Sequence, residues 1–116
     1  MSNHGPDVLA ELRLPARELR QRIPEAYEAF SKLHSAALAP GALDGKTKEL
    51  IALAVAVSSQ CDGCIASHAR GAHRQGATEQ EVAEAIGVTF LMSGGPATVY
   101  GPRAMAAFQA FANPEG

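Results

Sequence analysis

The stretch that decides the fold of this chain is Glu49-Leu-Ile-Ala-Leu-Ala-Val-Ala-Val-Ser-Ser-Gln-Cys61-Asp-Gly-Cys64-Ile-Ala-Ser-His68. Its first half is an apolar run, and its second half holds the only two cysteines of the chain, spaced C-x-x-C. The run is compatible with a buried strand, but it is rich in alanine, which favours helix over strand. We therefore expect a central buried helix, followed by a second helix that carries the cysteines and the histidine.

Local signals set the bounds of these two helices. Asp44 is a good N-cap for the first helix, which is expected to run to about Ser59. Polar residues then interrupt the apolar run just before Cys61. The second helix is expected to end at Gly76, because glycine commonly follows the last helical residue.

The flanking segments also carry helix signals, which give an all-α fold of about six helices. On the N-terminal side we expect a loose tail over residues 1–6, then a short helix from an Asp7 cap to about Leu12 and a separate turn begun by Pro15. A longer helix over 25–38 is expected to follow Pro24, with Phe30 and Leu33 on its apolar face. On the C-terminal side we expect a helix opened by the capping box Thr78–Glu81 that buries Val82, Ile86, Phe90 and Leu91, and a last helix within 97–111 with Pro102 at its start.

The composition limits the class of protein. The length of 116 residues predicts a single domain over 1–116, and the net charge of -2 gives no reason to expect binding to nucleic acid or to an anionic membrane. The N-terminus lacks the pattern of a signal peptide, and the longest apolar run is too short to cross a bilayer. We therefore expect a cytoplasmic protein, in which a C-x-x-C pair is more often catalytic or metal-binding than a permanent crosslink.

The residues around the cysteines suggest thiol chemistry. At about 100° per residue, Cys64 and His68 fall on the same side of a helix as Cys61, whereas His73 falls on another side. An imidazole four residues away and the helix N-terminus both favour a thiolate. If the two helices pack together, Glu49 can orient His68; otherwise it is a solvated glutamate of the first helical turn.

Metal binding is the main alternative for these side chains. Cys61, Cys64, His68 and His73 read C-x-x-C-x-x-x-H-x-x-x-x-H, but structural zinc motifs usually separate their two ligand pairs by about a dozen residues or more. We therefore expect neither a metal nor a cofactor. Outside this group, His34 is expected to have a structural role near a helix end, and Met92 and Met105 are expected to fill the core.

The spacing of Glu49, Cys61, Cys64 and His68 resembles the core motif of the AhpD-like alkylhydroperoxidases, which belong to the carboxymuconolactone decarboxylase superfamily. The flanking segments Lys-Glu-Leu-Ile-Ala-Leu-Ala and Ala-Arg-Gly-Ala-His-Arg-Gln-Gly-Ala-Thr are similar as well, so that the resemblance covers roughly residues 25–112. It implies an all-α fold that assembles into compact oligomers, commonly homotrimers or homohexamers. Oligomers also suit a small core that is poor in aromatic residues.

The resemblance implies a role for each residue of the motif. Cys64 would attack a hydroperoxide, and Cys61 would resolve the resulting sulfenic acid as a Cys61–Cys64 disulfide. His68 and Glu49 would form the proton relay that activates Cys64. A dithiol or a lipoylated protein would then reduce the disulfide.

Two other functions remain open. A cofactor-free lyase like carboxymuconolactone decarboxylase would leave the cysteine pair unexplained, and a non-enzymatic redox-sensing oligomer would use the pair without turnover. The residues between the cysteines bear on this choice, because peroxidase members of the family often carry a histidine there. This chain has Asp62 and Gly63 instead, and a carboxylate beside the pair is expected to raise the thiol pKa.

Overall fold

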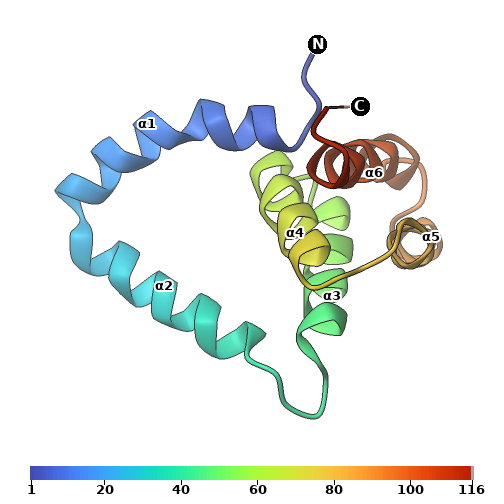
Figure 1. Cartoon of the computed structure of the whole chain (residues 1–116), viewed down its shortest axis with the longest axis horizontal. Coiled ribbons are helices and arrows are strands. Elements are labelled where there is room, and N and C mark those ends of the chain that lie inside the picture. Colours follow the sequence, from blue (N-terminus) through green and yellow to red (C-terminus); the bar gives the residue numbers. More distant parts are fainter. Residues whose placement is uncertain (116) are drawn as a thin grey trace.

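The computed structural model describes residues 1–115, and within them the chain is all α-helical, as expected (Figure 1). The helices are α1 (Pro6–Arg22), α2 (Pro24–Leu38), α3 (Gly45–Ser58), α4 (Asp62–Arg74), α5 (Glu79–Ser93) and α6 (Ala97–Ala112). In the part of the chain that is described, no helix combines the length and the apolarity needed to span a membrane.

Helices α3 to α6 pack around one hydrophobic core, and we call them the body of the molecule (Figure 1). The core is built from small and branched side chains around a single phenylalanine, namely Leu53, Ala56, Val57, Ile65, Ala69, Ala72, Val82, Ile86, Ala104, Ala107 and Phe108. The alanines of α4 let neighbouring helices approach closely, because they add almost no side-chain bulk between the backbones. This close packing gives α3 and α4 a rigid setting.

The predicted N-caps of α3 and α5 and the predicted stop after α4 are confirmed. The Asp44 side chain accepts a hydrogen bond from the Thr47 amide at 2.8 Å, which caps α3. At the start of α5, Thr78 and Glu81 form both hydrogen bonds of the capping box. Gly76 follows α4 with φ of 82°, a left-handed conformation that glycine adopts without strain.

Helices α1 and α2 form an arm over residues 6–38 that bends at Ile23 and arches away from the body (Figure 1). No residue of α2 is buried, and Phe30 and Leu33 on its apolar face are 64% and 62% exposed. The Lys48 side chain donates to the Ala39 carbonyl at 2.6 Å and so ties the end of α2 to α3. The apolar face of α2 therefore exists, but no part of residues 1–115 covers it.

Two prolines that were expected at helix starts lie inside helices. Pro15 is in the middle of α1 and Pro102 is the sixth residue of α6, so the predicted break at Pro15 and the predicted start at Pro102 are wrong. Both prolines are exposed. Each removes one backbone hydrogen bond, and on the solvent side water can satisfy the carbonyl that is left over.

The N-terminal segment is more ordered than the expected loose tail. The Asn3 side chain accepts hydrogen bonds from the amides of Gly5 and Asp7, and α1 begins at Pro6. Gly5 is buried against the last helix, beside Phe111. Asp7 is thus a residue of the first turn and not the N-cap.

The burial predicted from the sequence is wrong on the outer sides of α3 and α5, where several apolar side chains are exposed. Val82 and Ile86 are buried as expected, but Phe90 is exposed and Leu91 is 84% exposed. Met92, which was expected in the core, is exposed too, whereas Met105 packs against the core. On α3, which was expected to be buried all round, Ile51 and Val55 are also exposed. Each of these helices has one side that no other helix of residues 1–115 covers, so part of its apolar surface is exposed.

Candidate redox site

The site is built on the antiparallel hairpin of α3 and α4 (Figure 1). The two helices are joined by a tight turn in which Gln60 has φ of 55°. Glu49 lies eleven residues before Gln60 and Gly71 lies eleven residues after it. Because the helices run in opposite directions from this turn, Glu49 on α3 faces the part of α4 that contains His68 and Gly71.

The hairpin brings Glu49 and His68 into direct contact. His68 Nδ1 and Glu49 Oε1 are 2.8 Å apart, and Glu49 is only 9% exposed. The contact that the sequence left open is therefore present, and the solvated alternative for Glu49 is wrong. A buried carboxylate needs such a partner, and the bond fixes the plane of the imidazole while it leaves Nε2 free to exchange a proton.

The cysteines lie at the N-terminus of α4. A disulfide joins Cys61 and Cys64, whose Cα atoms are 5.2 Å apart. Cys61 is the N-cap residue, and its sulfur accepts a hydrogen bond from the Cys64 amide at 3.2 Å. Cys64 is the more exposed of the two, whereas Cys61 is half-buried. The positive end of the helix thus acts on the Cys61 sulfur, and Cys64 is the cysteine that an external molecule reaches more easily.

The two pairs are close but separate. His68 follows Cys64 by about one helical turn, a rise of roughly 6 Å along α4. Within residues 1–115, His68 makes no hydrogen bond to either sulfur. The structure thus brings together Glu49 with His68 and Cys61 with Cys64, as two separate pairs on one hairpin.

The two other histidines near the site have different surroundings. His34 of α2 stacks on the His68 ring, with ring centroids 5.8 Å apart and planes 15° apart. The sequence did not reveal this contact, because it depends on how the arm folds back on the body. His73 instead meets Phe108 edge-on at 6.0 Å, in keeping with its expected place on another side of α4. Within residues 1–115, no group of three or more His, Cys, Asp or Glu side chains is arranged to hold a metal ion.

The acidic residue between the cysteines is Asp62. It is exposed, and its carboxylate accepts a hydrogen bond from the Gly63 amide at 2.7 Å. The Leu12 side chain of α1 lies next to Gly63, so the first helix borders the cysteine turn. The Asp62 carboxylate therefore faces solvent and its own helix N-terminus.

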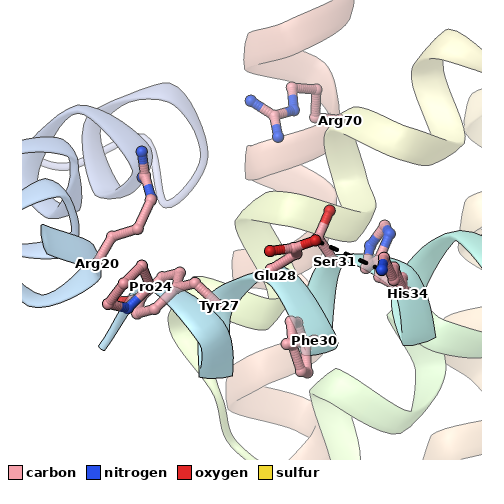
Figure 2. Close-up of a pocket in the computed structure, with 9 residues that line it drawn as sticks. Arg20, Pro24, Tyr27, Glu28, Phe30, Ser31, His34 and Arg70 are labelled. Carbon is pink, nitrogen blue, oxygen red and sulfur yellow. Dashed lines mark ion pairs between the residues drawn. The ribbon is translucent and has the colours of Figure 1, made fainter. Parts of the chain in front are cut away.

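Open cavities adjoin the histidines on the side of the arm. Figure 2 shows one of about 840 Å³, whose walls come from α1, α2 and α4 and include Arg20, Tyr27, Phe30, His34 and Arg70. The Arg20 guanidinium lies over the Tyr27 ring at 5.5 Å. A smaller, mostly apolar cavity of about 250 Å³ reaches His68. His34 lines both cavities, and His68 lines the smaller one, so a ligand in the smaller cavity would lie beside the stacked histidines.

The model of the carboxymuconolactone decarboxylase family matches residues 24–113. A solved structure of a carboxymuconolactone decarboxylase family protein from Legionella pneumophila superposes with a TM-score of 0.89 at 39% identity, over 95% of this chain and 98% of that one. One from Thermotoga maritima, with a suggested involvement in antioxidative response, gives a TM-score of 0.71 at 31% identity, over 78% and 93%. An uncharacterized protein from Cupriavidus necator is 38% identical over 88% of this chain and 90% of its own length.

Proposed function

Because the chain belongs to the carboxymuconolactone decarboxylase family, we propose that it is a peroxiredoxin-type alkylhydroperoxidase of the AhpD-like kind. In this proposal it reduces hydroperoxides, or disulfides, through the Cys61–Cys64 pair. The observation that carries the proposal is the buried Glu49 bonded to His68, one helical turn from a C-x-x-C disulfide. Thiol redox chemistry needs these parts together, whereas a cofactor-free lyase has no use for the two sulfurs.

The oxidative half of the cycle starts from the reduced pair. The Cys64 thiolate attacks the outer oxygen of the hydroperoxide, the O–O bond breaks, and the alkoxide leaves as an alcohol after taking up a proton. Cys64 is now a sulfenic acid. The Cys61 thiol attacks it, the S–O bond breaks, and water leaves as the disulfide forms. Two electrons pass from the two thiols to the peroxide.

His68 and Glu49 handle the protons in this scheme. A neutral His68 takes the proton of the Cys64 thiol and returns it to the leaving alkoxide. Glu49 holds Nδ1 of His68 and stabilises the imidazolium that forms in between. The exposure of Cys64 supports its role as the attacking thiol, while the helix N-terminus at the Cys61 sulfur would favour that thiolate when the disulfide is reduced again.

The reductant in this proposal is an external dithiol or a lipoylated protein. Its first thiolate attacks the disulfide to form a mixed disulfide, and its second thiol then releases the reduced enzyme. The exposed position of Cys64 gives such a partner access. A reducing compartment such as the cytoplasm would supply it.

We further propose that the protein works as a homotrimer or homohexamer. The support is the amount of exposed apolar surface, which lies on two separate parts of the molecule: Leu14, Leu19, Phe30 and Leu33 on the arm, and Val88, Leu91 and Met92 on α5. Surface of this kind usually marks an interface. Two different patches on one chain suit a ring in which the arm of one copy covers another copy.

The test is steady-state turnover of an organic hydroperoxide with lipoyl and other dithiol donors. Wild-type protein is expected to turn over, Cys64→Ser to lose activity to background, and Ser67→Ala, one turn further along the same helix, to remain active. Full activity of Cys64→Ser would contradict the thiol mechanism. Turnover of a lactone acid by the Cys61→Ser/Cys64→Ser double variant would instead favour the lyase.

A further inference from the structure

Gly71 of α4 lies directly under the Glu49 carboxylate. A methyl group built on Gly71 would overlap Oε2 and Cδ of the Glu49 side chain. No side chain tolerates such an approach, so the carboxylate occupies the space that any residue other than glycine would fill. The same carboxylate forms the bond to His68 with its other oxygen.

The backbone conformation does not explain a glycine here. Gly71 lies in the interior of α4 and has no positive φ, so an alanine would suit the helix itself better. Gly87 in the interior of α5 provides a comparison, because a methyl group there would meet nothing within 4 Å. The close contact with Glu49 is therefore the physical reason for the glycine at position 71.

We propose that Gly71 is a positioning residue for the reaction at the cysteines: its missing side chain lets Glu49 reach across the hairpin to His68. A methyl group would push the buried carboxylate away from α4 and with it from Nδ1 of His68. The imidazole would then lose the group that fixes its plane and its protonated nitrogen. This inference rests on the proposed function for its effect on catalysis, but its geometric part does not.

The catalytic test compares Gly71→Ala with Gly87→Ala in full-length protein. Gly71→Ala is expected to lower kcat by about tenfold or more with KM changed less than about twofold, because a proton-transfer group is misplaced while the substrate site is intact. Gly87→Ala should keep wild-type kinetics. In a Glu49→Gln background, Gly71→Ala should cause no further loss. Full activity of Gly71→Ala, or a loss that adds in full to that of Glu49→Gln, would overturn the inference.

A second readout works even if the protein proves to have no peroxidase activity. The NMR signals of the His68 imidazole should change in Gly71→Ala as they do in Glu49→Gln, and should stay unchanged in Gly87→Ala. Unchanged His68 signals in Gly71→Ala would refute the inference about Gly71. Absence of turnover in wild type would refute the proposed function alone.

Thermal stability gives a third comparison, which still applies if Gly71→Ala is less stable than wild type. In wild type, Gly71→Ala is expected to lower the Tm, because the methyl group collides with Glu49. In a Glu49→Ala background the collision is gone, so the same change should raise the Tm by a few degrees through helix propensity. The inference is overturned if Gly71→Ala lowers the Tm equally in both backgrounds.

Discussion

The arm and the α3–α4 hairpin are both pairs of helices of similar length joined by a short connection, yet they are built into the molecule in different ways. On the hairpin, Leu53 and Ile65 are completely covered, and even the charged Glu49 is buried. On the arm, Val8 alone is buried among the residues of α1, and α2 has no buried residue. The same helical periodicity thus yields a rigid support in one place and an uncovered apolar face in the other.

This difference in burial separates the residues of the candidate site from the residues that suit an interface. The cysteines and the Glu49–His68 pair lie on the covered hairpin, where tight packing holds side chains in fixed positions. The arm adds a single ring, His34, to the surroundings of His68. Its exposed apolar residues, among them Phe30 and Leu33, would suit a neighbouring subunit. We therefore expect substitutions in the body to affect folding and chemistry, and substitutions in the arm to affect assembly.

The largest effect should come from truncating the core of the body. Phe108→Ala removes a phenylalanine that is 1% exposed, and it should lower the free energy of unfolding by about 3–5 kcal/mol. Phe30→Ala removes the same atoms from the arm and should cost less than about 0.5 kcal/mol in the monomer. Chemical denaturation at low protein concentration measures both. Equal losses would show that the arm is as well packed as the body.

A smaller effect is expected on assembly, where substitutions in the arm should matter more than substitutions in the body. Phe30→Ala combined with Leu33→Ala should raise the dissociation constant of the oligomer by about tenfold or more, because both exposed side chains would be buried by a neighbour. Light scattering over a range of concentrations measures it. Lys32→Ala, which truncates an exposed charged side chain of the same helix, is the matched control and should leave the dissociation constant unchanged. A wild-type protein that is monomeric at micromolar concentration would refute the proposed oligomer.

The smallest effect should come from a surface ion pair of the body. Lys46 and Glu81 link α3 to α5 at 2.8 Å, and the hydrogen bond from Lys46 holds the pKa of Glu81 below its ordinary value. A lowered folded-state pKa contributes stability at neutral pH that is lost as the pH falls through it, below about pH 4.

Chemical denaturation of Lys46→Ala and of wild type at several pH values measures how this contribution to stability depends on pH. The variant should be slightly less stable at neutral pH, and the difference should shrink in acid. Lys32→Ala removes an ion pair on the arm whose partners are 3.4 Å apart, and it should change stability even less. A difference between Lys46→Ala and wild type that grows in acid would contradict the assignment.

The sequence predicted those parts of the fold that depend on local chemistry. Asp44 and the Thr78–Glu81 box cap their helices as expected, because capping involves only residues within one turn. Burial was less predictable. The spacing of Phe30 shows that α2 has an apolar face, but the spacing does not show whether the chain itself covers that face.

Much of the candidate site could also be predicted, since Glu49, the cysteines and His68 form one motif on two consecutive helices. The contact of Glu49 with His68 required the hairpin to close, which the structure shows. The motif does not predict the contacts of Gly71 and His34, because these contacts come from pairing between helices. For Gly71 a signal existed: it lies as far after the turn as Glu49 lies before it. His34 had no such signal.

The proposed mechanism requires Cys64 to be the thiol that is oxidised first. The direct measurement treats reduced Cys61→Ser protein with one equivalent of an organic hydroperoxide in the presence of a sulfenic acid trap, followed by peptide mass spectrometry. We predict that the trap labels Cys64, and that wild type forms the Cys61–Cys64 disulfide under the same conditions. A Cys61→Ser protein that stays unlabelled, while Cys64→Ser is labelled at Cys61, would contradict the account and assign the attack to the cysteine at the helix N-terminus.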